Sequence, residues 1–299
     1  MVHVVTVHWN SEVWIGPQLL HIAKHLPDDT RVYAALHGIS EARFAEFFYA
    51  ADLDGSHPDK LDALARIVFE QADDQDFIIF LDGDAFPIAL ITPSVLRGTA
   101  LAAVRRDEDL GERYPHPCFC LTTVGFWKRI DGTWQPGPVV LNALGHPIND
   151  SGCSLHRILE HRDEPWAPLL RSNTVDLHPL WFAVYDDLVY HHGAGFRERI
   201  EHVDAATRKT INPRAAARST RSPSWLPVVH RAERAFRYRA AARRRRKLRT
   251  DEFSAAADRL SEEVFQSILD DPDQFHERFV TPNPGSRTER IVDGYPSER

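Results

Sequence analysis

The feature that most constrains the fold is the stretch of residues 77–87. Residues 77–81 are apolar and β-prone, a pattern that predicts a strand buried on both faces. The strand leads into Asp82-Gly83-Asp84, and two such close carboxylates after a buried strand repel each other and resist desolvation. A divalent cation with a phosphate behind it would resolve this conflict, because carboxylate oxygens suit Mg²⁺ or Mn²⁺. The simpler alternative is a strand followed by an acidic turn.

The segments on either side of this strand alternate between strand and helix patterns. Before it, we expect strands at 2–8 and 31–36 and helices at 18–26, 41–50 and 59–71. After it, we expect a helical turn at 93–96, strands at 100–104, 118–123, 181–185 and 188–191, a helix that ends near 161, and loops at 107–117 and 131–147. The alternation predicts an α/β fold whose Rossmann-type mixed sheet is mainly parallel and is flanked by helices. Ligands bind such sheets beyond the carboxyl ends of the strands, where His8, His37 and the two aspartates are expected.

Length and charge distribution predict a main domain with a C-terminal arm. A chain of 299 residues can hold one large domain and an appendage. We expect a domain at 1–200, a helical extension at 201–280 and a flexible tail at 281–299. The extension contains the basic run Arg243-Arg244-Arg245-Arg246-Lys247, followed by a strongly acidic stretch. No aromatic residue interrupts that run, which argues against nucleic acid; the run could pair with the acidic stretch or make a peripheral contact with a membrane.

Cysteine usage and hydropathy favour a reducing compartment. The chain has Cys118, Cys120 and Cys153, an odd number without a CxxC pair, which argues against a disulfide framework and against structural zinc. No apolar run reaches the length of a membrane span, so no transmembrane helix is expected. The first residues enter a predicted strand without a basic lead, which makes a signal peptide an unfavourable interpretation. We therefore expect a cytoplasmic protein.

A metal bound by Asp82 and Asp84 needs a third protein ligand or several waters. Neutral imidazole can supply such a ligand, and His191 and His192 follow a predicted strand. The glycines after them would let backbone and phosphate come close. The alternative is a pair of loop histidines without a partner.

Five motifs occur in order within residues 2–200. They are Asp82-Gly83-Asp84 after an apolar strand, Ala85-Phe86-Pro87-Ile88, Tyr114-Pro115-His116-Pro117-Cys118-Phe119, Asp150-Ser151-Gly152 and His191-His192-Gly193-Ala194-Gly195-Phe196-Arg197. Together they resemble bacterial nucleotide-sugar glycosyltransferases of the GT-A fold, and the first motif carries most of the resemblance. It implies a half that binds a nucleotide diphosphate sugar, a half that binds a hydroxyl acceptor, and Mn²⁺ or Mg²⁺ on the diphosphate.

The resemblance also implies roles for individual residues. Asp84 would bind the metal directly, Asp82 would contact ribose or metal-bound water, and a late histidine would complete the shell. Gly83 would leave room for the ligand to approach. The nucleobase and ribose would lie at the end of the first strand and at the loop before the helix that precedes Asp82, near Thr6, His8, Trp9, Asn10, His57 and Lys60.

The chemistry of sugar transfer points to further side chains. Breaking a sugar–phosphate bond leaves new negative charge on the diphosphate, which a cation stabilises in the transition state. Arg105, Arg106 and Arg197 are candidates for additional contacts with that charge, or ordinary surface arginines. The acceptor hydroxyl must lose a proton as it attacks, and Asp150 is a candidate base or, alternatively, a helix N-cap. His116, between two prolines, belongs to the acceptor side or to a rigid loop.

Two other classes remain open from the sequence. A haloacid-dehalogenase-like phosphatase also places two aspartates after a buried strand, and Asp186-Asp187 could serve as its late acidic pair. Against it, that family wants Thr or Val two places after the second aspartate, where this chain has Phe86. A scaffold that binds sugar nucleotides or partners without catalysis is the non-enzymatic alternative. A P-loop ATPase is excluded, because the chain has no GxxxxGK[ST].

Overall fold

The computed structural model describes residues 1–106, 112–141, 147–173, 182–193, 227–248 and 252–279. The described residues divide into two compact units, one formed by those up to 193 together with 271–279, and the other by those from 227 to 270. Each unit is considered by itself. The predicted boundaries at 200 and 280 stay predictions, and the predicted tail at 281–299 lies outside the described residues.

The first unit is built on a seven-stranded sheet with the order β10-β6-β7-β4-β1-β2-β3. Its strands are β1 (Val2–Trp9), β2 (Arg31–His37), β3 (Tyr49–Ala51), β4 (Phe77–Asp82), β6 (Leu101–Arg106), β7 (Glu112–Thr123) and β10 (Ala167–Leu169). β1 is parallel to both β2 and β4, β2 is parallel to β3, and β6 is parallel to β10. Only β7 runs antiparallel to its neighbours in this sheet. The predicted mixed, mainly parallel sheet is confirmed.

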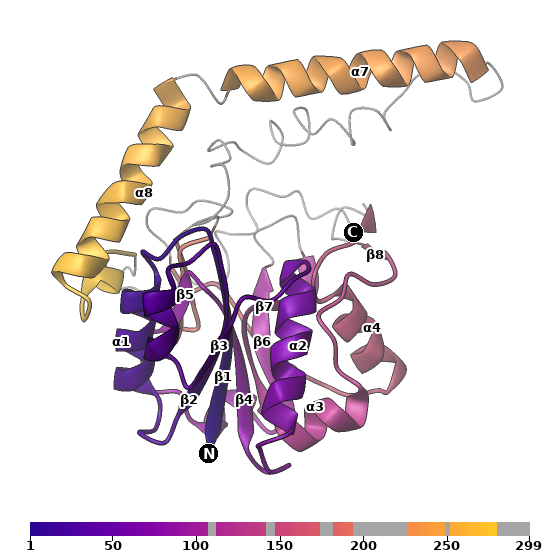
Figure 1. Ribbon diagram of the computed structural model, residues 1–299. Helices are drawn as coiled ribbons and strands as arrows, with labels where there is room; N and C mark the ends of the chain where they lie inside the picture. The colour runs from indigo at the N-terminus through magenta and orange to yellow at the C-terminus, as the bar shows by residue number, and fades with distance from the viewer. Residues whose placement is uncertain (107–111, 142–146, 174–181, 194–226, 249–251, 280–299) are drawn as a thin grey trace. The chain divides into compact units, whose positions relative to one another are not determined.

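Helices cover both faces of this sheet (Figure 1). One face packs against α1 (Ile15–His25), whose apolar stripe of Ile15, Ile22 and the following Leu26 is buried in the core. The other face packs against α2 (His57–Phe69), α3 (Val124–Ile130) and α4 (Cys153–His161). A capping box between Ser56 and Asp59 fixes the start of α2. This start lies at the carboxyl edge of the sheet, because α2 leads into β4.

A small antiparallel sheet follows directly after Asp84. It has the order β11-β12-β5, formed by β5 (Ala85–Pro87), β11 (Ala183–Tyr185) and β12 (Val189–His191). The two predicted late strands are therefore confirmed. Asp186, Asp187 and Leu188 connect these two strands, and both aspartates have positive φ, of 51° and 57°. A third, two-stranded sheet joins β8 (Val140–Leu141) to β9 (Pro147–Ile148).

Two local predictions were wrong. The expected helix at 41–50 is the 3₁₀ helix η1 (Glu41–Glu46) followed by β3. Here pairing with β2 as an edge strand overrides a helical sequence pattern, since Tyr49 lies opposite Tyr33. The expected loop at 107–117 is, from Glu112 onward, the first half of β7. The predicted turn at 93–96 is confirmed as η2 (Pro93–Leu96).

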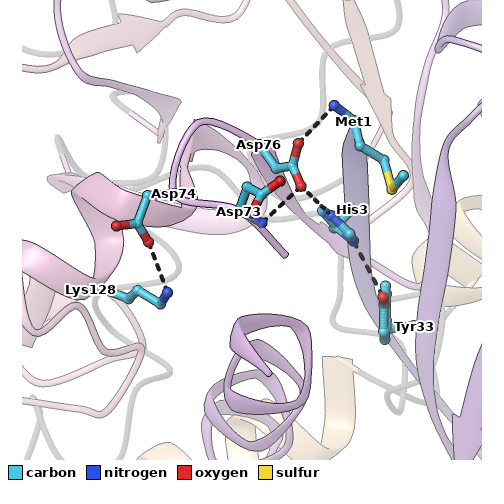
Figure 2. Close-up of polar contacts among 7 residues, drawn as sticks. All are labelled: Met1, His3, Tyr33, Asp73, Asp74, Asp76 and Lys128. Carbon is cyan, nitrogen blue, oxygen red and sulfur yellow. Dashed lines mark hydrogen bonds and ion pairs between the residues drawn. The ribbon is translucent and has the colours of Figure 1, made fainter. Parts of the chain in front are cut away.

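Polar contacts tie the strands together at the edge opposite their carboxyl ends (Figure 2). Oδ1 of Asp76 lies 2.9 Å from the amino group of Met1, and its Oδ2 lies 3.3 Å from Nε2 of His3. Nδ1 of His3 in turn lies 3.3 Å from the hydroxyl of Tyr33. Nearby, the ammonium of Lys128 pairs with Asp74 at 2.8 Å. β1, β2 and the start of β4 are thereby linked at this edge.

The second unit consists, in its described part, of α7 (Pro227–Leu248) and α8 (Glu252–Asp270). The basic run Arg243-Arg244-Arg245-Arg246-Lys247 belongs to α7. Residues 271–279 belong to the first unit and end in the 3₁₀ helix η3 (Phe275–Phe279). None of the described helices combines the length and the hydrophobicity that a membrane span needs.

Candidate metal centre

The turn between β4 and β5 brings two carboxylates and one imidazole together. β4 ends at Asp82, β5 begins at Ala85, and the antiparallel register places His191 of β12 opposite Ala85. Nε2 of His191 lies 3.6 Å from Oδ2 of Asp82 and 3.4 Å from Oδ1 of Asp84. Asp84 is only 3% exposed, His191 is buried and Asp82 is half-buried.

The three residues fit a divalent cation. One ligand atom from each of Asp82, Asp84 and His191 lies within 4.8 Å of the other two, as required of donors that share an ion. Oδ1 of Asp82 is buried and makes no well-aligned hydrogen bond within the described part of the chain, although His57 Nε2 lies 3.2 Å away. A buried carboxylate oxygen in that condition is costly unless a cation or a donor satisfies it. Two carboxylates with one imidazole are a donor set that Mn²⁺ or Mg²⁺ accepts.

The second histidine of the pair lies elsewhere. Successive side chains of a strand point to opposite sides, so His192 faces away from the carboxylates. Its Nδ1 lies 2.9 Å from the hydroxyl of Tyr190, and its ring packs 4.5 Å from that of Trp14. Its backbone N–H donates to the carbonyl of Asp84 at 3.0 Å. The structure thus brings His191 to the two carboxylates and places His192 against the aromatic side chains of Trp14 and Tyr190.

The charges around the group reinforce one another. Burial works against ionisation of Asp82, but the nearby imidazole of His57 and the charge of His191 outweigh it and keep the pKa of Asp82 below its usual value. Burial also works against a charged His191, yet the neighbouring Cys118 and Asp84 raise the pKa of this imidazole well above its usual value. The thiol of Cys118 itself is buried, and burial raises its pKa.

The paired strands β6 and β7 add an arginine and a histidine to the surroundings. The ring of His116 lies 6.2 Å from that of His191, and Nη1 of Arg106 lies 2.8 Å from Nε2 of His116. The interpretation of His116 as part of a loop is wrong, because it lies in β7. Arg106 ends β6, and Arg105 precedes it where the pairing of β6 with β7 is irregular. Arg197 lies outside the described residues.

Thr6 and His8 support the turn from beneath. Both are fully buried in β1, and both bond to Gln18 of α1: Thr6 Oγ1 donates to Gln18 Oε1 at 3.1 Å, and His8 Nε2 lies 3.0 Å from the same oxygen. Gln18 Nε2 donates to the backbone carbonyls of Asp82 and Ala85, each at 2.8 Å. The sequence analysis missed Gln18, although a polar residue within the buried stripe of an amphipathic helix was a signal that could have found it.

The remaining residues expected at the nucleotide lie at the carboxyl edge of the sheet. Trp9 ends β1 and is 48% exposed, and Asn10 follows in the left-handed region with φ 54°. His57 begins α2 and reaches Asp82, as described above. Lys60 lies one turn further along α2 and is buried. Gly83 is buried within the turn between the two carboxylates.

Asp150 is held in an exposed position before α4. Its Oδ2 accepts a hydrogen bond from the hydroxyl of the buried Tyr114 at 3.2 Å, and its Oδ1 accepts one from the N–H of Ser151 at 2.9 Å. The N-cap of α4 is Gly152, with φ 93°, so the alternative of Asp150 as the cap is wrong. A Cβ on Gly152 would lie 2.0 Å from the carbonyl oxygen of Pro115, which ties this loop to β7.

Comparisons with known proteins return structural likenesses alone. No family model and no curated protein matches the chain. The galactosyltransferase LgtC, solved with donor and acceptor sugar analogues, is 17% identical over 42% of this chain and 59% of its own, with a TM-score of 0.31. The apo form of the glycosyltransferase GlyE from Streptococcus pneumoniae TIGR4 is 14% identical over 56% of this chain and 44% of its own, with a TM-score of 0.35. TarS from S. aureus is 13% identical over 44% of this chain and 29% of its own, with a TM-score of 0.32.

The chain therefore spans less than two thirds of each of these three proteins. At such identities and TM-scores the likeness assigns no activity to the chain. What the comparisons add is that two of these similar solved structures, LgtC and GlyE, are glycosyltransferases.

Proposed function

We propose that the chain is a metal-dependent glycosyltransferase that moves a sugar from a nucleoside diphosphate sugar to a hydroxyl acceptor. One observation carries the proposal: Asp82, Asp84 and His191 converge at the carboxyl edge of a mainly parallel sheet. Ligands bind α/β sheets at this edge, and hard oxygen donors with open positions suit a cation that shares its shell with phosphate.

The residues of the chain divide the work as follows. A bound Mn²⁺ or Mg²⁺ supplies charge stabilisation to the diphosphate as it leaves. Asp82, Asp84 and His191 would hold that ion, and Lys60 in the first turns of α2 is a further candidate for contact with the nucleotide sugar.

Asp150 is the proposed base. The bond between the anomeric carbon and the diphosphate oxygen breaks, the acceptor oxygen bonds to that carbon, and the proton of the acceptor hydroxyl passes to the carboxylate of Asp150. Tyr114 and the N–H of Ser151 orient this carboxylate without neutralising it. The proposed setting is the cytoplasm, with a peripheral membrane contact through α7.

The phosphatase alternative loses its late acidic pair in the structure. Asp186 pairs with Arg97 at 2.6 Å, and Asp187 lies in the same hairpin turn. This turn precedes β12, whereas His191 is the last residue of that strand. The position two places after the second aspartate is the fully buried Phe86. No described contact favours phosphomonoester hydrolysis over sugar transfer.

The test is incubation with a panel of nucleotide sugars, with and without Mn²⁺, followed by measurement of released UDP or GDP. We expect release that depends on metal and that falls by more than about 100-fold in Asp84→Asn, because a metal-binding carboxylate is lost. Asp74→Asn, which changes an exposed carboxylate at the opposite edge, should release nucleotide at the rate of the unchanged protein. Phosphomonoester hydrolysis without nucleotide release would favour the phosphatase, and neither activity would favour the scaffold.

A further inference from the structure

The side chain of Gln18 links three segments that meet beneath the metal-type group. It comes from α1, it contacts Thr6 and His8 of β1, and it contacts the backbone at both ends of the turn that carries the carboxylates. Gln18, Thr6 and His8 are all fully buried. The hydrogen bonds among these three side chains therefore lie in the protein interior and not at its surface.

The contacts fix the orientation of the amide. Its two N–H donors must face the carbonyls of Asp82 and Ala85, because a carbonyl oxygen turned toward them would face two acceptors. Its oxygen then faces two donors, the hydroxyl of Thr6 and Nε2–H of His8. Burial lowers the pKa of His8 to about 4, and its neutral ring must carry the proton on Nε2, because the Gln18 oxygen that it faces can only accept. All four hydrogen-bonding capacities of the amide are thereby used.

We propose that Gln18 is a positioning residue that sets the backbone of the turn from Asp82 to Ala85 and, through it, the separation of the two carboxylates. Both carbonyls that flank the turn lie 2.8 Å from a single nitrogen, so neither can move away without breaking a buried hydrogen bond. All hydrogen-bonding groups of the Gln18 amide are used within the protein, so none remains to contact substrate. Gln18 therefore acts on the proposed metal ligands only through the backbone of the turn. Its effect on metal binding rests on the proposed function; its effect on the turn does not.

The decisive variant is Gln18→Glu, which keeps the size of the side chain but removes both N–H donors and turns an oxygen toward two carbonyls. We expect faster hydrogen exchange of the backbone amides at residues 83–85 and of the His192 N–H that bonds to Asp84. We also expect the affinity for Mn²⁺, measured with UDP and with GDP present, to fall by about 10-fold or more, as for other residues that support metal ligands. Gln18→Met, which is uncharged and of similar size, should show the same two effects if the glutamate variant does not fold.

The control is Asp76→Asn at the opposite edge of the same sheet (Figure 2). This change weakens the contacts with Met1 and His3 and so costs stability without touching the turn. We expect exchange at residues 83–85 and the Mn²⁺ affinity to match those of the unchanged protein.

Two outcomes are decisive in different ways. If both Gln18 variants leave exchange at 83–85 unchanged, or change it no more than Asp76→Asn does, Gln18 does not position the turn and the proposal is overturned. If exchange rises in the Gln18 variants but the unchanged protein binds no Mn²⁺ with either nucleotide, the role of Gln18 stands and the proposed glycosyltransferase function fails.

Discussion

Single residues show what a sequence pattern can and cannot reveal about this site. Asp82, Asp84 and His191 could be predicted, because the ends of buried strands and a late histidine mark places where charge needs a partner. The split between His191 and His192 needed the register of β12 against β5, which no local pattern gives. Gln18 was missed because it reads as one polar residue in a helix, and only the fold places it under the turn.

His21 is a residue whose burial has a measurable cost in acid. It lies in α1, and its ring stacks 4.4 Å from that of Phe86 and close to Phe275. Burial is the main reason that its pKa falls to about 4 from the usual 6.5; the positive neighbours His25 and Lys24 lower it further, while Asp273 acts in the opposite direction. His276, beside Phe275, also has a pKa below its usual value, mainly because of burial, and Lys24 contributes there too.

The prediction follows from the lowered pKa. As the pH falls below about 6.5, His21 binds a proton in the unfolded chain, but in the folded protein it does not do so until about pH 4. Between these two pH values, His21 therefore lowers the free energy of unfolding by up to about 1.4 kcal/mol per pH unit. His21→Phe keeps the ring stacking and removes the titration. Its thermal midpoint should therefore drop less than that of the unchanged protein between about pH 7 and about pH 5. An equal drop in both proteins would contradict this assignment.

At the scale of elements, the alternation of strands and helices predicted the sheet, and the exceptions have physical causes. The first half of β7 was taken for a loop, because that polar stretch contains Pro115 and Pro117, whereas its second half was predicted as a strand. The register between β6 and β7 shifts after Ala103, so the prolines lie where the ladder is irregular and a missing N–H costs little. The sequence could not show that irregularity, because it belongs to the pairing of two strands.

The element α7 carries a prediction of its own. It contains eight arginines and one lysine against one glutamate, and within its described half Val228 and Phe236 are 80% and 73% exposed. A basic helix with exposed apolar side chains binds anionic membrane surfaces, with about 1 kcal/mol from each Lys or Arg near the surface. We expect the full chain to sediment with phosphatidylcholine vesicles that contain phosphatidylglycerol, and not with phosphatidylcholine alone.

Charge-reversal variants distinguish this electrostatic contact from nonspecific adsorption to vesicles. Arg245→Glu on α7 should weaken vesicle binding several-fold, whereas Arg157→Glu on α4, the same change on an exposed residue of the first unit, should leave it unchanged. Equal loss in both variants, or binding to neutral vesicles, would count against a role for α7. Retention on nucleic acid instead of vesicles would restore the interpretation that the sequence disfavoured.

At the scale of the whole molecule, the chain returns to its first unit after residue 270. Phe275 and Phe279 of η3 pack on Tyr190, with ring centroids 5.0 Å and 6.1 Å away, and Phe275 also lies 5.9 Å from Phe86. The sequence placed these residues in a separate extension, because nothing in residues 271–279 shows which distant aromatic side chains they cover. β5 and β12, which carry the proposed ligands at their ends, are therefore buried by a segment remote in sequence.

Removing that cover should weaken the small sheet. Phe275→Ala deletes a buried ring and should cost about 3–5 kcal/mol of stability, as large-to-small changes of buried aromatic residues do. Thermal unfolding measures the loss, and faster amide exchange in β12 would locate it. Phe48→Ala, which truncates a ring that is 53% exposed, should change the midpoint far less. If Phe275→Ala and Phe48→Ala behave alike, η3 does not stabilise β5 and β12.

The late arrival of η3 has a consequence for synthesis. The ribosome adds Asp82, Asp84 and His191 well before it reaches Phe275. Until then, the Tyr190 side chain of β12 lacks its packing contact with Phe275. We therefore expect β5 and β12 to reach their full stability only after translation has passed Phe279, and a message truncated earlier to yield a product in which these strands exchange their amide protons faster.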